Sequence, residues 1–122
     1  MNDTHHLVRL YGLSTCDQVR KARAWFAERG AKVEFHDFKK VGVDPVKLAE
    51  WLTHLPWDAL INKRGLTWRG LTPDEKAAVV DSGSAVELML RKPSVIKRPV
   101  VEIADRLVVG FHPELYEPLI AA

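Results

Sequence analysis

The stretch from Leu7 to Phe38 decides the fold and reads LVRLYGLSTCDQVRKARAWFAERGAKVEFHDF. It opens with a short apolar run closed by Gly12, which predicts a strand. Apolar residues then recur with helical spacing over residues 17–29, at Val19, Ala22 and Phe26. Gly30 supplies a C-terminal stop for that helix, and residues 33–38 predict a second strand. A strand, a helix and a strand of this length favour two parallel strands joined by a right-handed crossover.

The middle of the chain, about residues 44–92, predicts only helices. Two helix starts have the same pattern, a capping residue followed by a proline in the first helical position. They are Asp44-Pro45 and Thr72-Pro73. We expect the first of these helices to end at Pro56. Further helix is expected over residues 84–90, until Pro93 stops it. This segment is predicted to be an all-helical insertion in an α/β frame.

Strand signals return near the end of the chain. Residues 100–103 and 107–109 flank Ala104-Asp105-Arg106, a short polar connection typical of a hairpin. His112-Pro113-Glu114 opens a final helix, with Leu115, Leu119 and Ile120 expected on its apolar side. The order of elements predicts one α/β domain over residues 1–122, with a mixed sheet and the helical insertion.

Composition excludes several classes of protein. The 122 residues are 47% apolar and 28% charged, with a net charge of +2 and dispersed Lys and Arg, so no nucleic-acid partner is expected. A single cysteine excludes an intramolecular disulfide, and the five histidines lack metal-ligand spacing. The polar N-terminus is unlike a signal peptide, and no apolar run approaches the ~20 residues of a membrane helix. We therefore expect a cytoplasmic protein without a membrane partner.

The one cysteine, Cys16, lies in the turn between the first strand and the first helix. Thr15 and Gln18 match a capping box that would place Cys16 in the first helical turn. There, unpaired N–H groups and the helix dipole favour the nucleophilic thiolate, and Arg20 would add positive charge. The alternative is that Cys16 is only a small buried apolar residue.

Three segments, in order, resemble the ArsC/Spx family of arsenate reductase-like proteins. They are LYG…TCDQVRKA at residues 10–22, LINKRGLTW at residues 60–68 and PSVIKRPV at residues 93–100. The resemblance covers nearly the whole chain. It implies a thioredoxin-like (glutaredoxin-like) fold with Cys16 as the nucleophile. It also implies Arg98 as the thiolate or anion partner and Pro99 as a cis proline facing the cysteine.

The family's arginine pattern is only partly present. Arsenate reductases of the family carry an arginine in the middle motif, one before the third-motif proline and one near the C-terminus. Arg98 matches the second, Asn62 stands at the first with Arg64 two residues later, and residues 109–112 carry no arginine. Binding of a tetrahedral dianion requires several charged hydrogen-bond donors, and this chain matches one of the three arginines. We therefore expect arsenate reduction to be absent or feeble. The chain is closer to the family's YffB-like branch, proposed to be glutathione-dependent thiol reductases.

Two functions of different classes follow from the resemblance. As an enzyme, the protein would use the Cys16 thiolate to attack a disulfide or, as an alternative, arsenate. Glutathione would serve as co-substrate, a glutaredoxin or a disulfide substrate is a possible partner, and no tightly bound cofactor is expected. Arg20, Asn62, Arg64 and Pro99 would bind substrate or glutathione. As an Spx-like regulator it would instead dock on RNA polymerase, but Val19 stands where Spx proteins carry a second cysteine.

Overall fold

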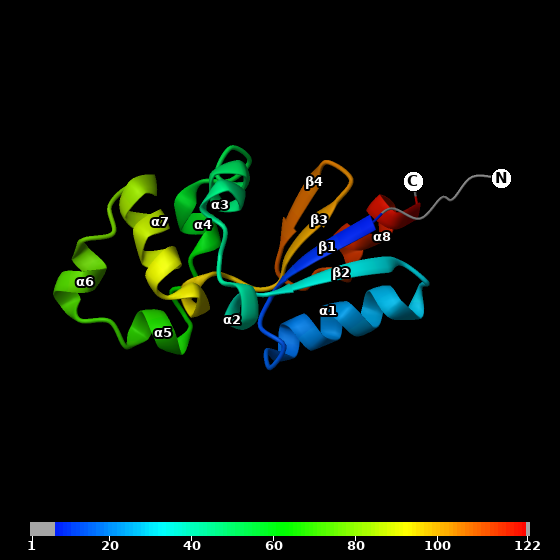
Figure 1. The fold of residues 1–122 in the computed structure, drawn as a ribbon, viewed down its shortest axis with the longest axis horizontal. Helices are drawn as coiled ribbons and strands as arrows, with labels where there is room; N and C mark the ends of the chain where they lie inside the picture. The colour runs from blue at the N-terminus through cyan, green and yellow to red at the C-terminus, as the bar shows by residue number, and fades with distance from the viewer. Residues whose placement is uncertain (1–6, 122) are drawn as a thin grey trace. The chain divides into compact units, whose positions relative to one another are not determined.

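The computed structural model describes residues 7–121, which form two compact units. The first comprises residues 7–38 and 98–121, and the second comprises residues 39–97. The elements of the first are β1 (Leu7–Gly12), α1 (Asp17–Glu28), β2 (Lys32–Asp37), β3 (Val100–Ile103), β4 (Arg106–Val109) and α8 (Pro113–Ala121). Figure 1 shows both units.

A four-stranded mixed sheet with the order β2-β1-β3-β4 forms the frame of the first unit. β1 pairs in parallel with β2, as predicted, while β1 with β3 and β3 with β4 are antiparallel. β1 and β3 are the central strands, and Tyr11 is opposite Val100 in their register. This arrangement confirms the predicted α/β, thioredoxin-like fold.

The core of this unit lies on the sheet face that α1 and α8 cover (Figure 1). Alternate residues of β1 and β3 point into it, as the two-residue period of a strand requires. Its fully buried or nearly buried members are Val8, Leu10, Val19, Ala22, Trp25, Phe26, Val101, Ile103 and Tyr116. The predicted apolar face of α1 is therefore confirmed, and Trp25 extends it.

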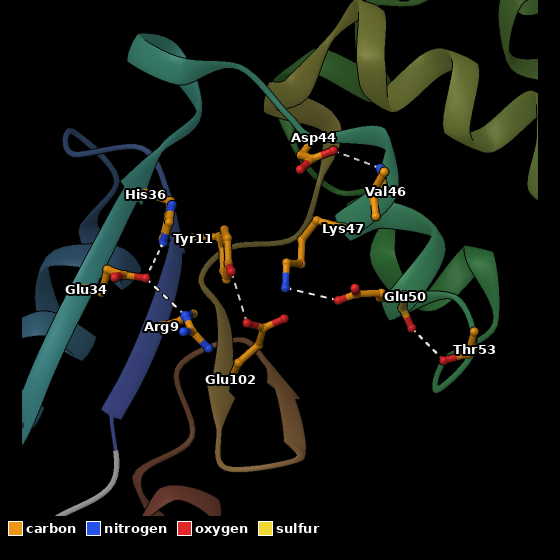
Figure 2. Close-up of polar contacts among 10 residues, drawn as sticks. All are labelled: Arg9, Tyr11, Glu34, His36, Asp44, Val46, Lys47, Glu50, Thr53 and Glu102. Atoms are coloured by element: carbon orange, nitrogen blue, oxygen red, sulfur yellow. Dashed lines mark hydrogen bonds and ion pairs between the residues drawn. The ribbon is translucent and has the colours of Figure 1, made fainter.

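The opposite face of the sheet carries polar side chains (Figure 2). Glu34 Oε1 accepts from Arg9 Nε at 3.0 Å and lies 2.9 Å from His36 Nε2. Tyr11 Oη donates to Glu102 Oε1 at 3.0 Å, and the Tyr11 ring stacks on His36. Burial, and then the charge of Glu102, raise the pKa of Tyr11 well above its usual range, so this phenol stays protonated.

The second unit is helical, as predicted for residues 44–92. Its elements are α3 (Pro45–Trp51), α4 (Trp57–Leu60), α5 (Leu66–Arg69), α6 (Pro73–Ala77), α7 (Ser82–Arg91) and the 3₁₀ turn η1 (Pro93–Val95); α2 (Phe38–Val41) leads into it. Asp44 caps α3 by accepting from the Val46 N–H at 2.9 Å (Figure 2). Thr72 and Glu75 form a complete capping box at α6.

Several boundaries differ from the prediction in this unit. α3 ends at Trp51 rather than at Pro56, because Thr53 Oγ1 donates to the Glu50 carbonyl at 2.6 Å (Figure 2) and closes the helix end. α7 is a separate helix that begins at Ser82, capped by Asp81, whose carboxylate accepts from the Ser84 N–H at 2.9 Å.

Two corrections concern the C-terminal part of the first unit. The hairpin connection is one residue shorter than predicted, since Arg106 already belongs to β4 and Ala104 adopts a positive φ of 56° in a tight turn. In α8, Leu115 is exposed and Tyr116 is the buried residue. The Tyr116 hydroxyl donates to the Gly110 carbonyl, and burial raises the pKa of this phenol to about 12.

Candidate functional site

Cys16 occupies the turn between β1 and α1, but one position earlier than predicted. Its N–H donates to the Leu13 carbonyl at 3.0 Å, which closes a turn after the strand. Its backbone is extended, with φ −80° and ψ 129°, and α1 begins at Asp17. Cys16 itself is therefore the N-cap, and the capping box predicted from Thr15 and Gln18 is wrong. The sulfur takes the place in which a capping side-chain oxygen normally lies.

The surroundings of the half-buried Cys16 thiol act in opposite directions on its pKa. Burial raises the pKa because it disfavours the charged thiolate. The Val19 N–H, a hydrogen bond from the Arg98 side chain, the Gln18 N–H and the Arg98 charge all lower it. The lowering contributions dominate, so the pKa of Cys16 lies below its ordinary value. The thiolate is the reactive form of cysteine, so these groups increase its reactivity at neutral pH.

Arg98 reaches the sulfur because β3 lies beside β1. The Arg98–Pro99 peptide bond is cis, as the family resemblance implied. The Pro99 carbonyl accepts from the Gly110 N–H at 2.7 Å, which ties this corner to the end of β4. Arg98 Cβ lies 3.7 Å from the position that a side-chain carbon on Gly12 would occupy. The predicted juxtaposition of the Arg98–Pro99 corner and the Cys16 turn is confirmed.

Gly12, the last residue of β1, permits the close approach of α1 to the strand. A Cβ atom at this position would lie 2.5 Å from Val19 Cγ2, and the Val19 side chain is fully buried. Because real atoms do not approach so closely, a larger residue would push the first turn of α1 away from β1. That turn carries the N–H groups that face Cys16.

Arg20 makes a different contact from the one expected. Its Nη2 donates to Asp17 Oδ1 at 2.7 Å, and both side chains are largely exposed. The Arg98 side chain, by contrast, lowers the pKa of Cys16 both through a hydrogen bond to the sulfur and through its charge. A positive charge next to the thiol thus comes from Arg98, just before β3, and not from the helix that Cys16 caps. A role for Arg20 toward substrate stays a prediction.

Asn62 and Arg64 belong to the second unit. Asn62 Oδ1 accepts from the Arg64 N–H at 3.1 Å, and the Asn62 N–H donates to the Val95 carbonyl at 2.8 Å. The carboxamide therefore shapes its own loop, where Gly65 packs so closely that a Cβ would lie 2.9 Å from Asn62 Nδ2. The Arg64 side chain lines a hollow of about 530 Å³ together with Asp58, Ile61, Asn62, Lys63 and Lys97.

Sequence reasoning left two features of these sites unidentified. Unpaired N–H groups of the first helical turn were expected near the sulfur, but the sequence did not identify them as those of Gln18 and Val19. Asp58 lines the hollow in the second unit and carries no local sequence signal.

Across residues 7–121, no cluster of three or more His, Cys, Asp or Glu side chains is arranged for a metal ion. Within the same residues, no helix is both long and apolar enough to cross a membrane.

Comparison with known proteins places the chain in a family. The profile described as "ArsC family" matches residues 11–119. An uncharacterized protein of Haemophilus influenzae is 32% identical over 115 residues, which covers 94% of this chain and all of the relative. The global transcriptional regulator Spx of Listeria innocua is 27% identical over 108 residues, covering 87% of this chain and 81% of Spx.

Solved structures agree with this assignment. A structure described as a YffB protein superposes with a TM-score of 0.87 at 42% identity, over 93% of this chain and 98% of that one. An arsenate reductase (ArsC) related protein from Brucella melitensis gives a TM-score of 0.71 at 45% identity, over 91% and 92% of the two chains. Together with the cysteine turn and the cis proline beside it, these matches show that the chain belongs to the ArsC family.

Proposed function

We propose that this protein is a glutathione-dependent thiol reductase in which Cys16 is the nucleophile. The observation that carries the proposal is the environment of the Cys16 sulfur. Two backbone N–H groups and the Arg98 guanidinium lower its pKa against the opposing effect of burial. A buried cysteine with only a packing role has no need of a charged donor at its sulfur. Membership of the family and the similarity to an arsenate reductase related protein support a thiol-based reductase.

The proposed reaction begins with attack of the Cys16 thiolate on a disulfide. A new S–S bond forms between Cys16 and one substrate sulfur, and the other sulfur leaves as a thiolate that takes a proton from water. A glutathione thiolate then attacks the Cys16 sulfur, which releases the second substrate thiol and leaves glutathione bonded to Cys16. A second glutathione restores the Cys16 thiolate and departs as oxidised glutathione. Two electrons thus pass from two glutathione thiols to one disulfide.

The need for an external thiol follows from the composition of the chain. It contains one cysteine, and the residue three positions after Cys16 is Val19. The chain has no second thiol that could resolve a mixed disulfide. Glutathione is the proposed resolving thiol, with a glutaredoxin as a possible macromolecular alternative.

Arsenate is the less favoured substrate. Arg98 is the residue that matches the oxyanion-binding arginines of the family's arsenate reductases, and Asn62 uses its carboxamide oxygen on the Arg64 N–H. Each missing charged contact costs roughly 1.5–3 kcal/mol, so two such losses reduce affinity about 10²-fold or more. We therefore propose that oxidised thiols are the main substrates.

Intact-mass spectrometry and a coupled turnover assay test this function together. Incubation with oxidised glutathione should add one glutathione at Cys16, and dithiothreitol should remove it. Turnover of a model disulfide by glutathione should vanish in Cys16→Ser and persist in Arg106→Ala, which removes an exposed cation of the same unit that has no expected role toward substrate. If Cys16 forms no adduct and the protein shows no turnover, the proposed reductase activity is refuted. A regulatory role, as in the Spx relatives, would then be the explanation to pursue.

A further inference from the structure

The hollow in the second unit has an unusual balance of charge. Three cationic side chains (Lys63, Arg64 and Lys97) line it with a single carboxylate, that of Asp58. Salt bridges elsewhere in residues 7–121 pair other charged groups, but none of the recorded ones involves these four side chains. Its volume of about 530 Å³ falls within the ~300–1,000 Å³ typical of small-molecule sites.

The structure around the hollow holds the backbone of its lining residues in place. The Lys97 N–H donates to the Leu60 carbonyl at 2.7 Å, and Ile61 forms an antiparallel bridge with Ile96. The hollow is thus built where two segments distant in sequence are hydrogen-bonded to each other. Ile61, Ile96 and Leu60 are buried, so their backbone is anchored by packing as well.

Lys63 is also positioned by aromatic rings. Its ammonium lies 5.8 Å from the ring centre of Trp57 and 5.4 Å from that of Trp68, within the ~6 Å range of cation–π attraction. The two rings orient the charge without neutralising it. A cation held in this way remains available to an anionic ligand.

We propose that this hollow binds the charged ends of glutathione, an inference that rests on the proposed function and deepens it. Glutathione carries two carboxylates, one at each end, and a single ammonium next to the γ-glutamyl carboxylate. Lys97, Lys63 and Arg64 supply positive charge for both carboxylates, and Asp58 supplies the one negative charge that the ammonium needs. A simple oxyanion such as phosphate uses the cations but gains nothing from Asp58.

Replacing Asp58 should therefore change the affinity for a glutathione analogue and the affinity for phosphate in opposite directions. The full chain is titrated with γ-glutamyl-2-aminobutyryl-glycine, a glutathione analogue without a thiol, and in parallel with inorganic phosphate, by calorimetry. Asp58→Asn should weaken binding of the analogue, because its ammonium loses a partner, and should strengthen binding of phosphate, because a repelling charge is removed. With an N-acetylated analogue, which lacks the ammonium, Asp58→Asn should no longer weaken binding.

Variants of the cations supply the matched controls. Lys97→Ala should weaken binding of the analogue about fivefold to tenfold, in the range of a charged contact at a partly open site. Arg69→Ala removes an exposed cation of the same unit that does not line the hollow, and it should change binding less than twofold. High salt should weaken the binding of the wild type, since the contacts are ionic.

A spectroscopic readout places the ligand on the structure. The indole N–H signals of Trp57 and Trp68 should shift on titration, because both rings contact the Lys63 side chain. Those of the buried Trp25 and Trp51 serve as internal controls and should stay in place. Shifts confined to the control rings, or weaker phosphate binding in Asp58→Asn, would overturn the inference.

The outcome is separable from that for the proposed enzyme. If glutathione supports turnover at Cys16 but the analogue binds Lys97→Ala as tightly as wild type, the hollow is not the glutathione site and the reductase stands. If the analogue binds with the expected dependence on Asp58 and no turnover occurs, the binding site stands and the reductase is wrong.

Discussion

Replacing Arg98 with alanine removes the charged side chain that is hydrogen-bonded to the Cys16 sulfur. Arg98 lowers the pKa of this thiol both by a hydrogen bond to the sulfur and by its charge. Without it, burial and the Gln18 and Val19 N–H groups remain, so the pKa should rise. Arg98→Lys should recover only part of the change, because an ammonium cannot reproduce the planar guanidinium fork.

The size of the effect follows from the exposure of the site. A buried charged hydrogen bond contributes ~1.5–3 kcal/mol, but Cys16 is only half-buried, so about 1 kcal/mol is appropriate. That energy corresponds to about fivefold less thiolate at a pH below the pKa. A more basic thiolate is also a better nucleophile, with a Brønsted coefficient of ~0.4–0.5. The net slowing of alkylation should therefore be about twofold to threefold.

The assay is the rate of iodoacetamide alkylation as a function of pH, with circular dichroism to confirm that each variant is folded. Arg20→Ala is the matched control, since Arg20 pairs with Asp17 instead of the sulfur, and its profile should overlay that of the wild type. An Arg98→Ala profile with an unchanged midpoint would refute the assignment of Arg98 to the thiolate. A midpoint shifted equally by Arg20→Ala would show a general effect of net charge.

Three further predictions concern stability. The pKa of Cys16 is lower in the folded chain than the ~8.5 of an unfolded one, so the thiolate stabilises the fold fully above about pH 8.5. This contribution disappears as the pH falls through the folded-state pKa. In urea unfolding, the free energy of unfolding of the wild type should therefore increase relative to that of Cys16→Ser as the pH rises through that window. Thr72→Ala removes the acceptor of the Glu75 N–H and should cost about 1 kcal/mol in urea unfolding, while a cost near zero would mean that the capping box contributes nothing. Gly12→Ala should cost about 1–3 kcal/mol because its Cβ meets Val19, and Val19→Ala in the same chain should recover part of the loss, as a double-mutant cycle in differential scanning calorimetry would report.

Much of the secondary structure of both units was predictable because its signals are local. The helical spacing of Val19, Ala22 and Phe26 alone identifies the buried face of α1. Asp44 and Thr72 were correctly predicted as helix caps, since a capping side chain bonds to N–H groups two or three residues away. The same kind of reasoning failed at Thr15, where two adjacent residues compete for one N-cap and the turn bonded to Leu13 places Cys16 there instead.

The candidate site was predictable only in part. Cys16, Arg98 and the cis Pro99 were expected from the resemblance to the family, and the structure brings them together. Spacing along the chain assigned Arg20 to the thiol because it lies one helical turn away, yet its guanidinium reaches Asp17. A long side chain such as that of arginine can reach several partners, and the three-dimensional positions of those partners decide which contact forms.

Sequence by itself determined the order of strands and helices, the buried face of α1 and the place of the lone cysteine between β1 and α1, because each depends on residues within a few positions of one another. Tertiary structure decided which charge reaches Cys16. Arg98 is distant in the chain and meets the sulfur only because β3 pairs with β1 across the centre of the sheet. The hollow that contains Asp58 and Lys97 likewise exists only through the bridge between Ile61 and Ile96. Pairing of distant segments is a sum of many weak contacts, so no short pattern of residues encodes it.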